Sequence, residues 1–367
     1  MESTVKLTRE QVIWLIFASA CGNIVYNFTW VVAVVNRPYW LATFIGVFLN
    51  IPFAIWIMYL GKYYQGRTIF DILENTLGKF ICSIIIIAYI SLNIAIAACM
   101  LNMYVSTIKV FFLQYTPPWV LMLFLVAMGA VFANSGITIL GRLFEMLVII
   151  FIFNFFSGFF LSFIRVFKIE NIAPIFDTTF LGFAKGVIIT AGNISECLLF
   201  LMITAGSIPD PQKHYIWAVK GLTYWAVVLS FAIFIMGGMI SPELLMRIAQ
   251  AGVAVSRIIQ IGEFIRGMEV LILITYQIFA IMKVSLCIYS SWVSAQKLLS
   301  LRNNKLHLIF VSIAVFSLSI WMNSFNTGYF LSLFLGTYII LPFAIFILLL
   351  TTLCIFIKNR NKGSALK

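Results

Sequence analysis

Charge is scarce in this sequence. Charged residues make up 10% of the 367 residues, whereas hydrophobic residues make up 63%, and the mean hydropathy is +1.07. Soluble globular domains carry about 25% charged residues, so the composition excludes a water-soluble globular protein. It predicts an integral membrane protein for which the lipid bilayer is both solvent and partner.

Residues that hold metals and cofactors are also rare. The chain has two histidines, His214 and His307, both beside polar segments, and it has no C-x-x-C pair. Zinc and haem sites are built from His and Cys ligands, so the sequence predicts no metal, no cofactor and no enzymatic activity. We expect all six cysteines to be buried free thiols: Cys21, Cys82, Cys99, Cys197, Cys287 and Cys354.

No small-residue cleavage site follows the first residues, MESTVKLTRE, which lead directly into an apolar run. This pattern predicts a first spanning helix and not a removable signal peptide. The net charge of +12 would favour nucleic acid binding in a soluble protein, but here the cations lie in short loops and in the tail. We therefore expect no nucleic acid partner and expect these cations to orient the chain in the membrane.

Ten apolar runs of spanning length predict ten transmembrane helices in a single membrane domain, 1–367. They lie at about 9–35, 38–61, 80–112, 118–136, 142–165, 179–206, 215–240, 258–295, 306–324 and 331–357. The third and eighth are long enough to tilt or to project beyond the bilayer. Because a cytoplasmic N-terminus places most Lys and Arg residues inside, we expect both termini, including the basic tail 358–367, in the cytoplasm.

A Gly-Asn pair interrupts the first helix of each half of the chain. Gly22–Asn23 follow the start of helix one at the same offset as Gly192–Asn193 follow the start of helix six, and both residue types are poor helix formers. Each half, 9–165 and 179–357, holds five helices, so the second half must be inverted relative to the first. Paired interruptions in an inverted repeat indicate a binding site at the membrane midplane.

A helix broken at the midplane leaves free N–H groups on one segment and free C=O groups on the other. These groups suit the carboxylate and the amine of a small zwitterion such as an amino acid. The alternative is that Gly22 and Gly192 only allow neighbouring helices to approach closely. The predicted ligand-binding residues are Cys21, Gly22, Asn23, Gly192, Asn193, Ser195 and Glu196.

Three ionisable side chains lie inside predicted spans, where the cost of burying charge marks them as functional candidates: Glu145, Glu196 and Lys283. Glu196 lies one turn beyond the second Gly-Asn pair and can bind a ligand amine or hold a half-helix in place. Lys283 lies on a polar stripe of helix eight with Tyr276, and Ser285 is nearby. It belongs either to the site or to a structural ion pair with Glu145 or Glu196, and Glu145 can instead snorkel to the cytoplasmic face.

Four stretches form an ordered series along the chain: LENTLGKFICSIIIIAY (73–89), KIENIAPIFD (168–177), SPELLMRIAQAG (241–252) and FIRGMEVLILI (264–274). Together with the length and the ten-helix plan, they resemble the B subunits of nutrient germinant receptors, the spore germination permease-like family of the amino acid–polyamine–organocation (APC) transporter superfamily. The resemblance implies a LeuT-like fold whose helices one and six are discontinuous around the substrate. Two stretches depart from the family pattern: CGNIVYNFTW lacks a proline, and ISE replaces Gly-aromatic-Glu.

The resemblance also implies that helix eight lies beside helix one, where sodium-coupled relatives bind a cation. Lys283, with Ser285 and Glu145, is therefore expected to mimic the ion or to act in gating. The implied function is a receptor subunit that binds a small nutrient such as an amino acid and signals germination with A-type and C-type (lipoprotein) subunits in the inner membrane of the spore. The alternative is a proton-coupled amino acid transporter with Glu196 as its titrating group. The departures leave the nutrient unidentified.

Overall fold

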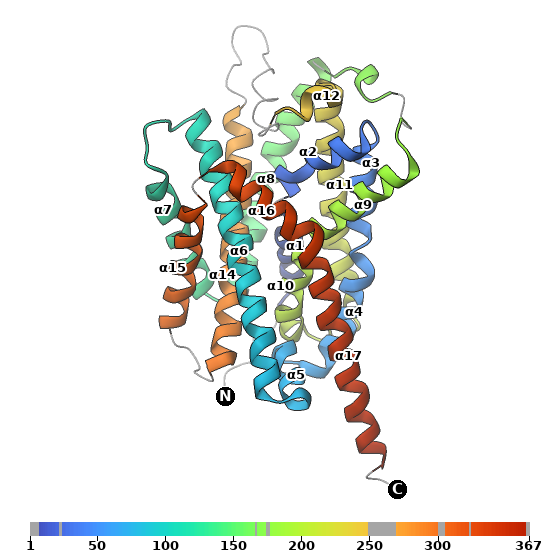
Figure 1. Cartoon of the computed structure of the whole chain (residues 1–367), viewed down its shortest axis with the longest axis vertical. Coiled ribbons are helices and arrows are strands. Elements are labelled where there is room, and N and C mark those ends of the chain that lie inside the picture. The colour runs from blue at the N-terminus through green and yellow to red at the C-terminus, as the bar shows by residue number, and fades with distance from the viewer. Residues whose placement is uncertain are drawn as a thin grey trace.

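The computed structural model describes residues 7–21, 24–165, 167–173, 177–248, 269–299, 305–322 and 324–364, and its regular structure there is entirely helical (Figure 1). The predicted all-α membrane protein is therefore confirmed. The elements are α1 (Arg9–Ala20), α2 (Ile24–Val35), α3 (Tyr39–Phe48), α4 (Ile51–Gly61), α5 (Ile69–Leu77), α6 (Lys79–Phe111), α7 (Pro118–Asn134), α8 (Ile137–Arg165), α9 (Phe180–Ile194), α10 (Glu196–Thr204), α11 (Tyr215–Met239), α12 (Pro242–Leu245), α14 (Glu269–Leu299), α15 (Lys305–Trp321), α16 (Phe325–Phe334), the π-helix η4 (Leu335–Ile340) and α17 (Leu341–Ser364).

Within the described ranges, seven helical segments are long and apolar enough to cross a membrane. They are Tyr39–Tyr64, Lys79–Phe111, Ile137–Asn154, Phe180–Ser207, Tyr215–Met239, Leu273–Leu299 and Phe325–Lys358. Two further apolar helices, α7 and α15, are shorter, and the predicted first span is divided into α1 and α2. Each of the ten predicted ranges thus contains helix, while the count of ten spans stays a prediction.

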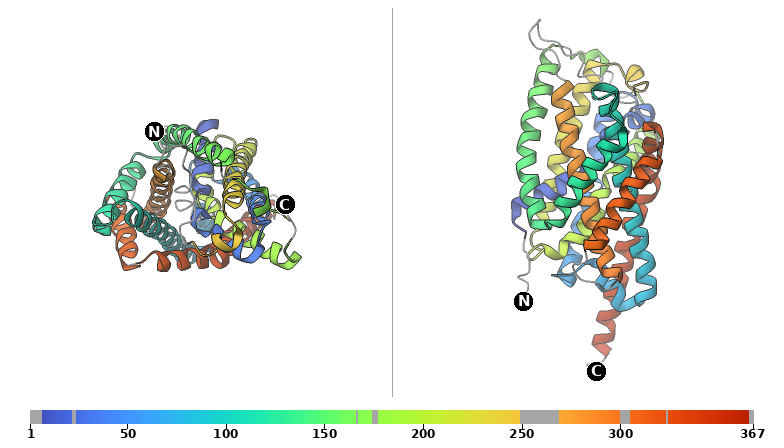
Figure 2. Two further views of the ribbon diagram at one scale, coloured as in Figure 1. Left: turned by 90° about the horizontal axis from the view of Figure 1, so that it is seen from above. Right: turned by 90° about the vertical axis from the view of Figure 1, so that its left-hand side faces the viewer.

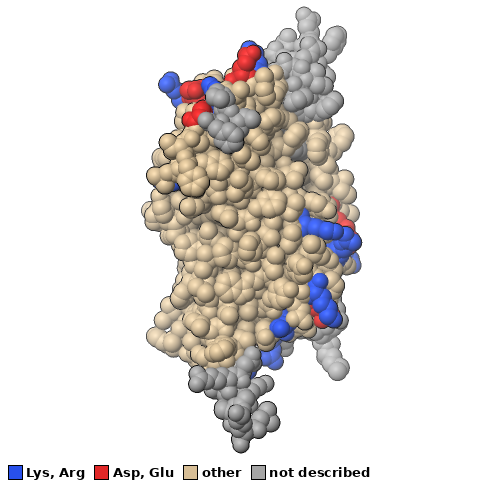
Figure 3. All heavy atoms as spheres, turned by 90° about the vertical axis from the view of Figure 1, so that its right-hand side faces the viewer, with Lys and Arg blue, Asp and Glu red and all other residues tan. Residues whose placement is uncertain are grey.

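The helices form an elongated bundle with both termini at the same end (Figures 1 and 2). On one face, charged side chains lie towards the two ends and along one edge, and the surface between them is uncharged (Figure 3). Such a broad apolar surface is what contact with lipid hydrocarbon requires. The long helix α17 continues beyond the rest of the bundle at the end where the termini lie (Figure 1).

Elements at equivalent positions of the two predicted halves are neighbours in space. The helix α6 packs against α14, α7 against α15, α3 against α11, and α1 against α10. Viewed from above, α6, α7, α14 and α15 occupy one side of the bundle (Figure 2). An inverted repeat predicts this arrangement, because its pseudo-twofold axis brings corresponding helices together.

Local sequence explains where several helices begin. In α1, the Gln11 amide donates to the Thr8 hydroxyl and the Thr8 amide donates to the Gln11 side chain, a reciprocal capping box. Thr68 and Asp71 form the same arrangement at the start of α5. Gly78 then adopts a φ of +83°, a conformation that favours glycine, and this turn leads directly from α5 into α6.

Candidate functional site

The first break lies at the end of α1. This helix ends at Ala20, Cys21 leaves helical geometry with a ψ of 83°, and α2 begins at Ile24. The predicted site residues Gly22 and Asn23 lie outside the described residues. The first span is thus discontinuous where the Gly-Asn pair predicted, and the last carbonyl groups of α1 are left without helical partners.

The second break lies at Ser195, just beyond the predicted Gly192–Asn193. Here α9 ends at Ile194 and α10 begins at Glu196, and the Ser195 hydroxyl donates to the Gly192 carbonyl oxygen at 2.5 Å. Asn50, at the junction of α3 and α4, donates its side-chain amide to the Ala191 carbonyl oxygen at 3.0 Å. Both side chains satisfy carbonyl groups in the last turn of α9. Sequence reasoning gave no role to Asn50, which marks a third interruption.

The predicted ligand residues Gly192 and Asn193 are fully surrounded by protein. Gly192 faces the backbone of Gly336 so closely that a Cβ atom added at Gly192 would collide with the Gly336 carbonyl oxygen. In return, the Asn193 side chain fills the space beside Gly336, and its amide donates to the Ile189 carbonyl oxygen at 2.8 Å. Gly336 belongs to the π-helix η4, a rare element that is frequent at functional sites. At Gly192 the helix α9 and the π-helix η4 approach each other closely, as the alternative interpretation of this glycine predicts.

A buried ion pair joins the two breaks. The Lys283 ammonium of α14 lies 2.6 Å from Oε2 of Glu196, and it donates to the Ser19 carbonyl oxygen of α1 at 2.7 Å. The two charged side chains are 3% and 2% exposed. Lys283 thus lies at the carbonyl end of α1, and Glu196 is the first residue of α10, so each charge complements the dipole of the helix end it meets.

The other two residues grouped with Lys283 lie elsewhere. Ser285 donates to the Ile281 carbonyl oxygen of its own helix at 2.6 Å, and its backbone faces Gly129 of α7. Glu145 is half-buried on α8. Of the two ion-pair partners left open for Lys283, the structure brings Glu196 to it, and it places Ser285 on a different face of α14.

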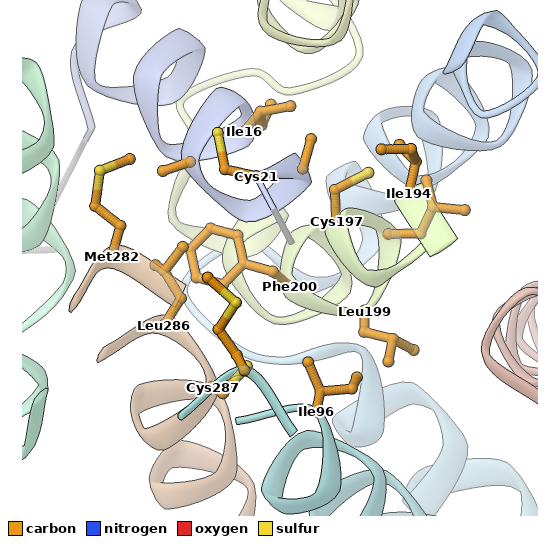
Figure 4. Packing of buried hydrophobic residues seen from close by; sticks show 14 of the residues in the cluster. Ile16, Cys21, Ile96, Ile194, Cys197, Leu199, Phe200, Met282, Leu286 and Cys287 are labelled. Carbon is orange, nitrogen blue, oxygen red and sulfur yellow. The ribbon is translucent and has the colours of Figure 1, made fainter. Parts of the chain in front are cut away.

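Thiols surround the ion pair. All six cysteines are free and buried, and Cys21, Cys197 and Cys287 each lie close enough to Lys283 to interact with its charge. In Figure 4 Cys21, just after α1, Cys197 of α10 and Cys287 of α14 lie around the ring of Phe200. Thiols are weak hydrogen-bonding groups, so the pair is held in dry, polarisable surroundings that strengthen its attraction.

Aromatic hydroxyl groups gather on the α2 side of the break. The rings of Tyr26 of α2 and Tyr276 of α14 meet edge to face with centroids 5.4 Å apart, and Tyr104 of α6 lies close to Tyr26. Within the described part of the chain, the Tyr104 hydroxyl is buried without a hydrogen-bond partner, and the Tyr26 hydroxyl has only that of Thr107 beside it. A buried polar group that lacks a partner costs free energy unless a water or a ligand supplies one.

This pair of phenol groups is a site feature that sequence reasoning missed. Tyrosines inside apolar helices are abundant in this chain, and most pack as ordinary hydrophobic residues. Tyr26 and Tyr104 are distinguished by their place beside the break together with buried hydroxyl groups that have few partners among the described residues, and only the three-dimensional arrangement reveals this. Among the described residues, no group of three or more His, Cys, Asp or Glu side chains is placed to hold a metal ion.

Comparison with known proteins connects this geometry to a family. The sequence model described as spore germination protein matches residues 6–327. Spore germination protein YndE of Bacillus subtilis (strain 168) is 25% identical over 194 residues, which span 52% of this chain and 52% of YndE. Spore germination protein A2 of the same organism is 23% identical over 316 residues, 84% of this chain and 85% of that protein.

Two solved structures share the fold. A Na⁺-coupled sialic acid symporter in a substrate-bound, outward-open state has a TM-score of 0.66 at 12% identity, over 91% of this chain and 80% of that one. MhsT in complex with L-phenylalanine has a TM-score of 0.70 at 14% identity, over 94% and 88%. At these identities the likeness establishes the LeuT-like transporter fold alone. The family match over most of the chain shows that this membrane protein belongs to the spore germination protein family, and the family and the fold together point to a transporter-like, non-enzymatic protein.

Proposed function

We propose that this chain is the membrane subunit of a germinant receptor and binds a small nutrient, such as an amino acid, between the two helix breaks. The observation that carries the proposal is the pair of buried hydroxyl groups of Tyr26 and Tyr104 beside the start of α2. A ligand carboxylate between these hydroxyls and the first turn of α2 accepts hydrogen bonds from both hydroxyls and from the N–H groups of that turn. The remaining ligand atoms then meet a largely apolar interior.

In this proposal Lys283 takes the place of a coupling cation. A cation at the broken first helix needs carbonyl oxygens and a carboxylate, and the Lys283 ammonium already has both in Ser19 and Glu196. Because a tethered ammonium is always present, nutrient binding needs no dissolved sodium ion. The ion pair thereby holds α1, α10 and α14 in one arrangement whether or not a nutrient is bound.

The same ion pair bears on the choice between the two functions left open by the sequence, a signalling receptor subunit and a proton-coupled transporter. A proton-coupled transporter with Glu196 as its titrating group needs that carboxyl to gain and lose a proton during each cycle. Protonating this carboxyl would break its ion pair with the ammonium 2.6 Å away and leave the buried Lys283 charge without its counter-ion. This observation favours binding and signalling. The likeness to solved transporters supports the alternative of amino acid transport, here without proton uptake by Glu196.

An assembly with other subunits is part of the same proposal, and the family supports it. The curated relatives are named as spore germination proteins. We propose that the chain lies in the inner membrane of the spore with both termini in the cytoplasm, and that it signals with A-type and C-type (lipoprotein) subunits. In such an assembly this chain would contribute the nutrient site, and its partners would carry the signal onward.

A hydroxyl deletion tests the proposal. Replacing Tyr104 by Phe removes one hydrogen-bonding group and keeps the ring, so the nutrient concentration for half-maximal germination should rise about tenfold. Tyr59→Phe is the matched control, because that side chain is about half exposed on α4. Uptake of the radiolabelled nutrient by vesicles holding the chain separates the two functions. A nutrient concentration for half-maximal germination that is unchanged by Tyr104→Phe would overturn the proposed site. Accumulation of the nutrient inside vesicles would favour transport.

A further inference from the structure

A cavity lies at the end of the bundle opposite the two termini. Its volume is about 440 Å³, and it lies where α6 and α15 end and where α7 and α16 begin, elements that can be followed in Figure 1. Phe325, the first residue of α16, separates it from the midplane site, because this ring lines the cavity and also meets Tyr26 at 6.0 Å. The volume lies within the range of small-ligand sites.

The polar groups of this cavity favour an anion. Lys109 lines it together with Ser106, and no Asp or Glu is among the lining residues. Among the described residues, no carboxylate pairs with Lys109 to neutralise its charge. The first turns of α7 and α16 also border the cavity and add the partial positive charge of two helix N-termini.

A buried amide forms part of the inner wall of the cavity. Asn102 lines the cavity and is 1% exposed. Its amide nitrogen donates to the Ser319 carbonyl oxygen at 3.3 Å, but its Oδ1 is buried with no hydrogen-bond partner among the described residues. This oxygen lies against Gly328, so near that a Cβ atom added there would meet it, and Asn102 thus ties the end of α6 to α15 and α16 beside the cavity.

The rim of the cavity is apolar and faces outward from the bundle. Val110, Trp119 and Ile320, one from each of α6, α7 and α15, are 57%, 52% and 42% exposed. In a membrane-spanning bundle, side chains exposed in this way contact lipid, and Trp residues at helix ends lie at the level of the headgroups. The opening therefore joins an anion-binding interior to the lipid phase.

We propose that this cavity holds the headgroup of an anionic phospholipid. The phosphate lies against Lys109 and Ser106, and the acyl chains run along the rim made by Val110, Trp119 and Ile320. A nutrient dissolved in water would have to cross that apolar rim. A phospholipid can place its charged headgroup inside the cavity while its apolar acyl chains stay at the rim. The site is independent of the midplane nutrient site and has its own test.

Native mass spectrometry of the full chain in detergent tests this site with two lipids of identical acyl chains. Phosphatidylglycerol carries the net negative charge, and phosphatidylcholine carries none. We expect the wild-type chain to retain phosphatidylglycerol about tenfold more strongly, because one charge-assisted contact contributes roughly that factor. Lys109→Gln should abolish the preference, and Lys109→Arg should keep it.

The control is Lys185→Gln, since Lys185 is exposed on α9 and does not line the cavity. It should leave the preference unchanged, and a thermal unfolding curve for each variant shows that all are folded. Equal retention of both lipids by the wild type, or a preference that survives Lys109→Gln, would overturn the proposal. Displacement of the bound phosphatidylglycerol by millimolar L-phenylalanine would also overturn it, because the cavity would then be a site for soluble carboxylates.

Discussion

The ammonium of Lys283 lies 2.6 Å from the Glu196 carboxylate, and both side chains are almost completely buried. The two residues belong to α14 and α10, and the same ammonium binds the Ser19 carbonyl oxygen at the end of α1. The Lys283 ammonium thus binds the carbonyl end of α1 and, through the Glu196 side chain, connects it to the start of α10. Removing either charge leaves the other in a dry interior, and this asymmetry makes the pair testable.

Lys283→Met should reduce the amount of folded protein. The substitution keeps a long apolar side chain but leaves Glu196 charged and unpaired, and breaking a buried pair costs about 3–5 kcal/mol. The measurement is the unfolding temperature in detergent together with the yield of monodisperse protein. Lys185→Met is the control, because Lys185 is exposed on α9. An unfolding temperature equal to that of the wild type would show that the ion pair does not stabilise the bundle.

The double variant Lys283→Met with Glu196→Gln should be more stable than Lys283→Met alone. With both charges removed, no unpaired ion remains in the interior, so the two effects should not add. Unfolding temperatures of the wild type, both single variants and the double variant complete the thermodynamic cycle. If the two losses simply add, Lys283 and Glu196 act independently, and the pair is not what joins the helix breaks.

Gly192→Ala should destabilise the crossing of α9 with the π-helix. The added Cβ would meet the Gly336 carbonyl oxygen, which is backbone and cannot rotate away. Overpacking of this kind costs about 1–3 kcal/mol. Ile188→Ala, on a 54% exposed position of the same helix, is expected to change the unfolding temperature much less. If the Gly192→Ala protein is as stable as the wild type, the two helices are not packed too closely to accept a Cβ atom at this position.

The ion cluster between α5 and α14 should make stability depend on acid pH. Lys297 contacts both Asp71, at 2.8 Å, and Glu74. Burial acts to raise the pKa of Asp71, but hydrogen bonds from Lys297 and Thr68 outweigh it and hold this pKa below its ordinary value. A lowered pKa contributes stability that is present above the ordinary value of about 3.9 and is lost as the pH falls through the folded-state pKa.

Unfolding temperatures of the wild type and of Asp71→Asn should therefore differ by a constant amount at neutral pH and converge in acid below about pH 4. Asp210→Asn is the control, because Asp210 and its partner Lys213 are both more than half exposed, at 58% and 70%, and 3.9 Å apart. It should have little effect at any pH. A difference for Asp71→Asn that persists unchanged in strong acid would contradict a lowered pKa.

Hydropathy predicted most of the fold because a bilayer demands about 20 apolar residues for each span, and the break positions followed from residues that helices avoid. Contacts between residues far apart along the chain cannot be predicted from hydropathy or from helix-breaking residues. Glu196 and Lys283 were both recognised as costly charges, but nothing in the sequence distinguishes Glu196 from Glu145 as the partner. The Ser19 carbonyl is chemically like every other backbone carbonyl, and only the end of α1 makes it available.

The same limit applies to the candidate site. Gly192 was recognised as an interruption, yet its contact with Gly336 depends on a π-helix near the other end of the chain that no local pattern marks. Tyr26 and Tyr104 are ordinary aromatic residues in sequence. Their significance comes from their place beside the break and from buried hydroxyl groups with few partners there, which are properties of the folded interior.

The most direct test of the account is nutrient binding to the purified chain with and without sodium. Thermal unfolding with each of the twenty common amino acids identifies the one that stabilises the protein most, and its dissociation constant is then measured in sodium and in choline buffers. The account predicts equal constants in the two buffers, because the Lys283 ammonium occupies the cation position, and about tenfold weaker binding by Tyr104→Phe. Binding that requires sodium, or no stabilisation by any amino acid, would contradict it.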